Sequence, residues 1–193
     1  MDHFLYHGSH TPSISTLEPR SRLHDSDLRV IYLTANIPYA LLYIWDSFHN
    51  EYDRKYVTGW IKNGITYYEE QFPNQLQSFY GNVSGSLYLA ADTEQFHELD
   101  THELMFYSTQ KIPVVQEIHI QDVYQELLRY EREGYIHILR YNDATPQRQN
   151  ELIRLIAEAS IIKGNLTKSD SPRARFFQKH FTSAWEYAQR CTQ

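Results

Sequence analysis

The hydrophobic pattern of this chain changes its period near residue 145, and that change limits the fold to one class. Before it, short β-branched and aromatic runs are separated by turn residues, as in "RVIYL" at 29–33 and "SGSLYLAA" at 84–91. After it, apolar residues recur at the i, i+3, i+4, i+7 spacing of an amphipathic helix, at Leu152, Leu155, Ile156 and Ala159. Strands that come first and helices that come last predict an α+β protein.

The strand region carries two further local signals. Phe4–His7 predicts a first strand, which is expected to stop at the following glycine. Asn63-Gly64 stands between two β-prone runs, and this is the strongest short-range indication of a hairpin. Within the same region, Tyr39–Phe48 reads as a helix because its apolar residues fall on one side.

Helix starts are marked by capping residues. Asp122 is placed to cap a short helix, and Thr145-Pro146 and Ser171-Pro172 each join a capping hydroxyl to proline at the first helical position. We expect the last helix to be continuous, with an apolar face formed by Phe177, Phe181, Ala184, Trp185 and Ala188. The domain prediction is a β-rich domain over 1–144 and a helical extension over 145–193 packed on it.

Composition excludes several classes of protein. The chain of 193 residues has no run of about 18 apolar residues, so we expect no membrane span. Its start lacks a secretory leader, and its single cysteine, Cys191, cannot form an internal disulfide, which predicts a cytoplasmic protein. The formal net charge of −6 makes non-specific nucleic-acid binding unfavourable.

No residue pattern predicts a metal site. The stretch "HELDTHEL" at 97–104 has histidine and carboxylates, but the His-Glu-x-x-His spacing of zinc hydrolases is broken by Asp100. The seven glycines are scattered, so there is no glycine-rich phosphate loop. We therefore expect no metal, and no dinucleotide held by the usual strand–loop–helix route.

Three short motifs follow one another along the chain: "YHGS" ending the first strand, "IYLT" ending the second, and "VQEIHIQD" on a later one. Their order resembles the ADP-ribosyltransferase superfamily, in its His-Tyr-Glu branch of poly(ADP-ribose) polymerases and diphtheria-type toxins. The matching residues are His7, Tyr32 and Glu117. The resemblance covers about residues 3 to 125 and implies a split, mixed β-sheet core to which the C-terminal helices are added.

The resemblance also implies a reaction. NAD would be the substrate, and His7, Tyr32 and Glu117 would be catalytic. Loss of nicotinamide leaves a ribosyl cation, which a fixed carboxylate such as that of Glu117 stabilises. The NAD-binding residues implied are His7, Gly8, Ser9, Tyr32, Thr34 and Tyr43. Gly8 would let the backbone approach the nicotinamide amide, and the two tyrosines would stack on its ring.

Each of these residues also has an ordinary structural explanation. His7-Gly8-Ser9 is a turn in most proteins that contain it, Tyr32 on an apolar strand is more often core, and Glu117 could face solvent. The chain also lacks the glycine that many relatives carry before the second motif, where it has "SDLRV". Arginine as acceptor is disfavoured, because Val115 stands where arginine-specific transferases favour Glu or Gln.

Three functions stay open at this point. The first is an ADP-ribosyltransferase-like enzyme that cleaves NAD and passes ADP-ribose to an unknown acceptor. The second is an inactive module of the same fold that binds a nucleotide or a protein. The third is an NAD-dependent RNA 2′-phosphotransferase, suggested by Arg20, Arg22 and Arg29 between the first two motifs. Exposed aromatics on the C-terminal helices leave a homodimer open as well.

Overall fold

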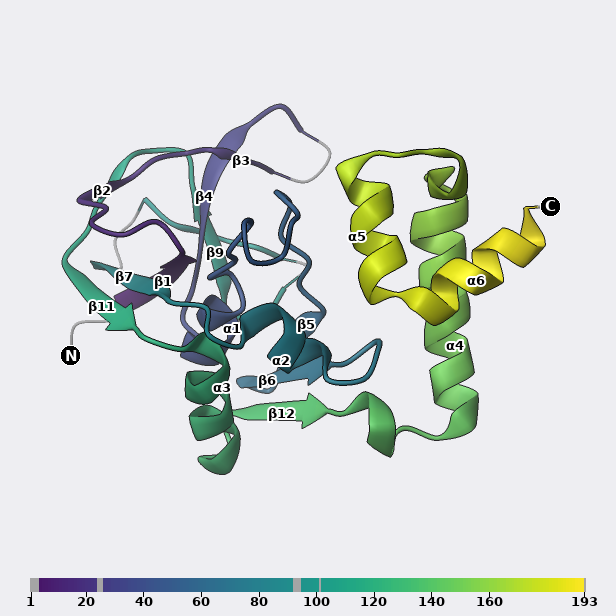
Figure 1. Ribbon diagram of the computed structural model, residues 1–193. Coiled ribbons are helices and arrows are strands. Elements are labelled where there is room, and N and C mark those ends of the chain that lie inside the picture. The colour runs from purple at the N-terminus through teal and green to yellow at the C-terminus, as the bar shows by residue number, and fades with distance from the viewer. Residues whose placement is uncertain (1–3, 24–25, 92–94, 101, 193) are drawn as a thin grey trace. The chain divides into compact units, whose positions relative to one another are not determined.

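The computed structural model describes residues 4–23, 26–91, 95–100 and 102–192 (Figure 1). The chain contains both helices and antiparallel sheets, so the predicted α+β class is confirmed. It divides into two compact units: unit 1 is Met1–Asp46, Val57–Tyr68 and Tyr80–His137, and unit 2 is Ser47–Tyr56, Glu69–Phe79 and Ile138–Gln193. Among the described residues, no helix has both the length and the apolar character needed to cross a bilayer.

Unit 1 is built on an antiparallel sheet. Its strand order is β11-β7-β1-β4-β9-β8, and β3 pairs with β4 outside this path. The strands are β1 (Phe4–Ser9), β3 (Ser21–Arg22), β4 (Arg29–Thr34), β7 (Gly85–Ala91), β8 (His97–Glu98), β9 (Met105–Ser108) and β11 (Gln116–Ile120). A smaller pair joins β10 (Ile112–Pro113) to β2 (Thr16–Leu17).

The two faces of this sheet are covered by different parts of the chain. One, here the loop face, carries a hydrophobic cluster made of Leu5, Leu17, Ile31, Leu33, Tyr88, Ala90 and Ile112. The opposite face, here the helix face, is covered by helix α1 (Ile37–Leu41). This is shown by Gly8, where an added Cβ would point at the Ala40 carbonyl in α1. Side chains alternate between faces along a strand, so Tyr32, between Ile31 and Leu33, belongs to the helix face.

The first strand does not end where the sequence predicted. It continues through Gly8 to Ser9 and pairs residue by residue with β7, from Phe4 opposite Ala91 to Ser9 opposite Ser86. The prediction of a stop at Gly8 is wrong because the glycine serves packing against α1 and not a turn. The strand predicted over residues 29–33 is β4, which extends one residue further, to Thr34.

The predicted helix Tyr39–Phe48 is also corrected. Helix α1 begins two residues earlier, with Asn36 as its cap, and ends at Leu41. Ile44 and Trp45 stay buried without helical structure, at 0% and 5% exposure. Their burial accounts for the apolar pattern that was read as helix, and aromatic and β-branched residues favour helix only weakly.

Other local predictions are confirmed. Asn63 and Gly64 have φ of 53° and 77°, as a two-residue hairpin turn requires, and join β5 (Gly59–Lys62) to β6 (Ile65–Glu69). Asp122 caps helix α3 (Val123–Arg132) by accepting from the Gln125 amide. The strand predicted after Gly134 is β12 (Ile136–Leu139), which belongs to a sheet of order β12-β6-β5.

Unit 2 is mainly helical. Its helices are α4 (Pro146–Ile156), which continues as the π-helical segment Ala157–Ile162, then α5 (Pro172–His180) and α6 (Thr182–Cys191); α2 (Gln75–Tyr80) starts in this unit. Thr145 and Ser171 cap α4 and α5 as predicted. The expected single last helix is instead two, because the backbone turns at Phe181, with φ −110° and ψ 50°. All five residues of its predicted apolar face are nevertheless buried.

Many aromatic residues whose role the sequence left open form the core of unit 2. Tyr52 stacks on Phe176 with ring centroids 4.3 Å apart, and Tyr56 lies within 6.2 Å of Phe79 and 5.8 Å of Phe177. These rings fill the space between α5 and the segments 47–56 and 69–79. They therefore stabilise the unit rather than form an exposed acceptor surface.

Candidate functional site

The structure brings His7 and Tyr32 together where β1 and β4 meet. His7 Nδ1 lies 2.9 Å from the Tyr32 carbonyl oxygen. A carbonyl can only accept, so Nδ1 carries the proton, and in the neutral ring Nε2 is then an acceptor. Between these strands Tyr6 lies opposite Thr34. The imidazole of His7 thus adds a hydrogen bond between β1 and β4 next to that pair.

Gly8 has a packing role that the sequence did not reveal. A Cβ at this position would clash with the Ala40 carbonyl oxygen and would lie 3.2 Å from Ile44 Cγ1. The glycine therefore lets α1 approach β1 closely, and this alone accounts for it. Its predicted contact with a nicotinamide amide stays a prediction.

A group of tyrosines lies on the helix face beside Tyr32. The rings of Tyr39 and Tyr43 are 5.5 Å apart, and their hydroxyl oxygens are 3.5 Å apart. Burial raises the pKa of Tyr43, and the nearby hydroxyls of Tyr39 and Tyr32 raise it further. The Tyr32 hydroxyl donates to the Arg22 carbonyl at 3.0 Å. Tyr43 therefore lies near Tyr32, and Tyr39 is a member of the group that the sequence did not indicate; stacking of Tyr43 on a nicotinamide stays a prediction.

Ser9 and Thr34 already have partners within the chain. Ser9 Oγ accepts from the Thr11 amide at 3.1 Å. Thr34 is 2% exposed, and its hydroxyl donates to the Leu104 carbonyl and accepts from the Asn36 amide. These contacts shape the turn into α1, and a further role in holding NAD stays a prediction.

Glu117 is fixed by hydrogen bonds on the loop face. Its Oε1 accepts from Ser86 Oγ at 2.6 Å, from the Tyr88 hydroxyl at 3.0 Å and from the Ser13 amide at 3.2 Å. The bond from Ser86 is the main cause that lowers the pKa of Glu117, so the carboxylate is ionised at neutral pH. Glu117 is exposed to solvent.

The three predicted catalytic residues are only partly brought together. The registers place His7, Tyr88 and Glu117 in one row across β1, β7 and β11. The backbones of His7 and Glu117 are two strand spacings apart, which is about 10 Å. Residues opposite one another in register share a face, so the side chains of His7, Tyr88 and Glu117 lie on the loop face, whereas that of Tyr32 lies on the helix face. The sheet therefore stands between the Glu117 carboxylate and the tyrosine group.

A different carboxylate, Glu103, lies just before β9 and is held by the turn between β5 and β6. Its two oxygens accept from the amides of Asn63 at 2.8 Å and Gly64 at 2.7 Å. The Gly64 carbonyl in turn accepts from the side chain of Asn36, which caps α1 and so positions Tyr39. Glu103 also lines a solvent-open hollow of about 450 Å³.

Sequence reasoning missed Glu103 because it considered "HELDTHEL" only as a metal motif. The available signal was a glutamate two residues before the apolar strand "MFYS", which pairs with the strand of Tyr32. Among the residues that the structure describes, no three His, Cys, Asp or Glu side chains gather as metal ligands.

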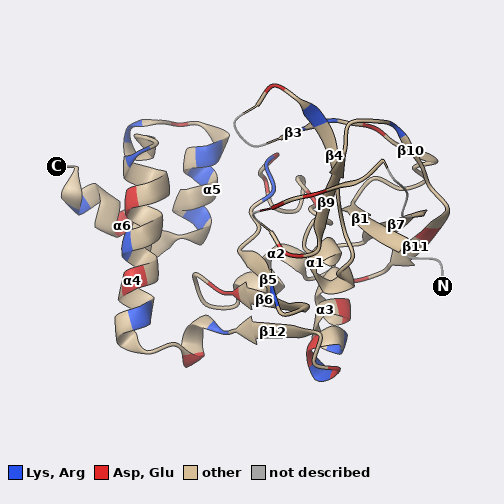
Figure 2. Cartoon of the chain, turned by 180° about the vertical axis from the view of Figure 1, so that it is seen from behind, with Lys and Arg blue, Asp and Glu red and all other residues tan. Residues whose placement is uncertain are grey.

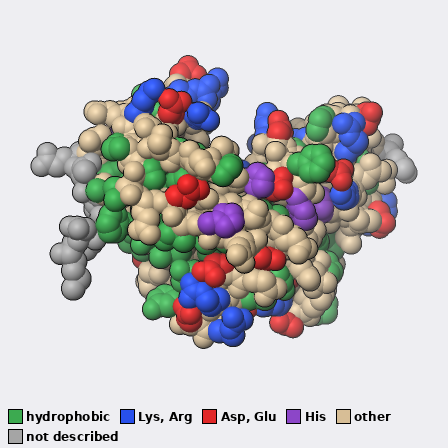
Figure 3. All heavy atoms as spheres, turned by 60° about the vertical axis from the view of Figure 1, so that its left-hand side comes forward, with side chains coloured by type: hydrophobic (Ala, Val, Ile, Leu, Met, Phe, Trp, Pro, Cys, Tyr) green, Lys and Arg blue, Asp and Glu red, His purple; other side chains and the backbone are tan. Residues whose placement is uncertain are grey.

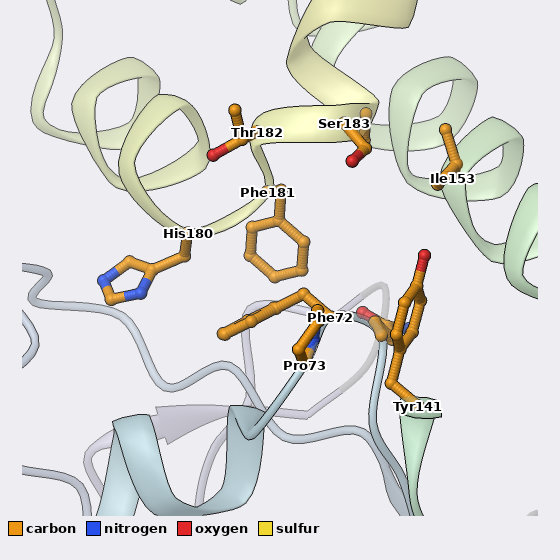
Figure 4. A pocket seen from close by; sticks show the side chains of 10 residues that line it. Phe72, Pro73, Tyr141, Ile153, His180, Phe181, Thr182 and Ser183 are labelled. Carbon is orange, nitrogen blue, oxygen red and sulfur yellow. The ribbon is translucent and has the colours of Figure 1, made fainter. Parts of the chain in front are cut away.

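Unit 2 contains a second hollow, with an empty volume of about 410 Å³ (Figure 4). Phe72, Phe181 and Tyr141 form much of its wall, and Thr182 and Ser183 at the start of α6 lie across from them. The pocket is small and partly open, and it holds no cluster of titratable groups that could act on a substrate.

Comparisons of the chain with protein-family models, with curated proteins and with solved structures each find no match.

Proposed function

We propose that unit 1 binds NAD at the tyrosine group and cleaves its nicotinamide–ribose bond, passing ADP-ribose to an acceptor. The observation that carries the proposal is the contact between His7 and the Tyr32 carbonyl. It joins His7 to the backbone of Tyr32, 25 positions further along the chain, and the ring of Tyr32 belongs to the group of aromatic rings on the helix face. Aromatic rings suit the flat nicotinamide, and each stacked pair contributes about 0.5–1.5 kcal/mol beyond burial.

The proposal assigns the carboxylate of the reaction to Glu103. Departure of nicotinamide leaves positive charge on the ribose, and a carboxylate in fixed position stabilises that charge. Glu103 is held by two backbone amides of a turn that is joined through Asn36 to helix α1, which carries Tyr39. A carboxylate offers about four acceptor positions, so two stay available for a ribose hydroxyl or a cation. Glu117, the assignment from the sequence motif, is the competing candidate.

The test is nicotinamide release from NAD by the wild-type chain and by the variants Glu103→Gln and Glu117→Gln. Glu186→Gln, an exposed position on α6, is the matched control. We expect Glu103→Gln to lower the rate about 10²–10³-fold, the usual loss when a preorganised group is removed. Glu117→Gln and the control should keep most of the wild-type rate. If only Glu117→Gln loses nicotinamide release, the catalytic carboxylate is Glu117, as the sequence motif implied.

A second candidate function is a binding module without catalysis. It is favoured by the position of Glu117, whose Oε1 receives three hydrogen bonds on the face away from the tyrosines. In this case NAD or a related nucleotide would bind saturably, but no variant and no acceptor would yield free nicotinamide. Nucleotide titration together with the release assay separates the two functions.

A further inference from the structure

Strand β11 forms one edge of the unit 1 sheet, and this edge is open. Among the described residues β7 is the only strand that pairs with β11, so the backbone groups on its other side have no ladder partner. Figures 1 and 2 show β11 at the margin of unit 1. Proteins usually protect sheet edges with very short strands, lysine or proline. At the opposite edge β8 is only two residues long, whereas β11 has five residues and contains neither lysine nor proline.

The side chains along this edge are exposed and partly apolar. Val115 and Ile118 are 57% and 37% exposed, and Glu117 and His119 also face solvent. Because side chains alternate along a strand, Glu117 and His119 share the loop face and Ile118 lies on the helix face. In Figure 3, which turns the left-hand side of Figure 1 forward, acidic and histidine side chains lie near hydrophobic ones. An exposed edge of this kind is a template for a further strand.

The sequence of β11 is complementary to itself. If two copies pair antiparallel about Ile118, each Ile118 lies opposite its counterpart, and Glu117 of each copy lies opposite His119 of the other. Opposed side chains of an antiparallel pair have Cβ atoms about 5 Å apart, and opposite charges in this position are stabilising. A two-fold contact needs this kind of self-complementarity, in which the same surface meets itself. The charge pattern therefore fits a second copy of the chain.

Glu117 is also prepared for such a contact. Hydrogen bonds from Ser86, Tyr88 and the Ser13 amide all reach Oε1, so among the described residues Oε2 has no hydrogen-bond donor. We propose that the chain forms a homodimer in which β11 pairs antiparallel with β11 of a second copy, so that the two unit 1 sheets become continuous. The fixed Glu117 carboxylate then presents Oε2 to the imidazole of the other copy.

Disulfide cross-linking tests the register of this pairing. Cys191 is the only cysteine, so each variant is made in a Cys191→Ser chain. Ile118→Cys places a thiol opposite its own counterpart, at a separation that a disulfide can span. Gln116→Cys is the matched control on the same face, because its counterpart lies four residues along the partner strand, about 13 Å away. With oxidised glutathione, we expect Ile118→Cys to form linked dimers at least about ten times faster than Gln116→Cys.

Sedimentation velocity measures the dimer without cross-linking. The edge is short, so we expect a weak interface with a micromolar dissociation constant. The mass of the wild-type chain should rise from 23.0 kDa towards twice that value as concentration increases to about 500 µM. His119→Glu places like charges opposite one another at both contacts and should raise the dissociation constant about fivefold or more. His97→Glu, the same substitution on β8, should leave it unchanged. Circular dichroism checks that both variants fold.

Three results would overturn the inference. The first is a wild-type chain that stays monomeric over the whole concentration range, which would leave the edge to an extended peptide. The second is a dimer that Leu155→Lys dissociates and His119→Glu does not, which would place the contact on α4, where Leu155 is 55% exposed. The third is Gln116→Cys that links as fast as Ile118→Cys. None of these measurements involves NAD, so the inference and the proposed function can fail separately.

Discussion

Replacing Gly8 by alanine tests the packing that positions the tyrosine group. The added Cβ would meet the Ala40 carbonyl oxygen and would lie 3.1 Å from the Ala40 carbonyl carbon and 3.2 Å from Ile44 Cγ1. Two of these atoms are backbone of α1, so they cannot rotate away, and the helix itself must move. Inserting a methyl group into a packed region costs about 1–3 kcal/mol in the free energy of unfolding. For a chain of this size, each kcal/mol lowers Tm by roughly 2–4 °C.

Urea unfolding followed by circular dichroism measures this change. Ser9→Ala is the control, because it alters the next residue of the same strand without adding atoms; it should stay within about 0.5 kcal/mol of wild type. A Gly8→Ala variant that unfolds at the wild-type urea concentration would refute the close contact between β1 and α1. Unchanged stability together with lost NAD affinity would instead show that Gly8 serves the ligand, as the sequence motif implied.

Two further predictions concern unit 2. Burial, with Lys179 adding to it, lowers the pKa of His180 to about 4. Between this value and the ordinary histidine pKa near 6.5 the unfolded chain binds more protons than the folded chain, so the free energy of unfolding should fall as pH drops from about 6.5 to 4. In unfolding curves measured across this range, His180→Gln should reduce the dependence of that free energy on pH. An equal pH dependence in both proteins would contradict the buried position of His180. Arg148 holds Glu69 through two parallel bonds of 2.9 and 2.8 Å. A double-mutant cycle with Arg148→Ala and Glu69→Ala should give a coupling energy of about 1 kcal/mol, the upper end for exposed pairs, and a value near zero would show that the pair does not form in solution.

Features encoded by neighbouring residues could be predicted from the sequence. The Asn63-Gly64 turn needs only two residues that accept positive φ, and the caps at Asp122 and Thr145 need only a side-chain oxygen a few residues before a free amide. Such signals do not depend on the rest of the fold. They located most strands and helices correctly, and they separated the strand region from the helices after residue 145.

Features that depend on distant contacts could not be predicted in this way. The first strand passes through Gly8 because α1, more than 30 residues later, occupies the space of a side chain. Helix α1 ends at Leu41, although Ile44 and Trp45 are buried at the spacing that an amphipathic helix would show. Local periodicity reports burial and does not identify the backbone geometry that achieves it.

The candidate site shows the same limit. The motifs placed His7 and Tyr32 together, but they could not show on which face of the sheet a carboxylate lies. Glu117 is in register with His7, so both side chains lie on the loop face, across the sheet from Tyr32. Glu103 is held by Asn63 and Gly64, which come from a hairpin about 40 residues earlier.

The most direct test of the account is a crystal structure of the Glu103→Gln variant soaked with NAD. The account predicts the nicotinamide ring on the helix face among Tyr32, Tyr39 and Tyr43, with the ribose near position 103. A nicotinamide ring on the loop face beside Glu117, or NAD bound away from the tyrosine group, would contradict it.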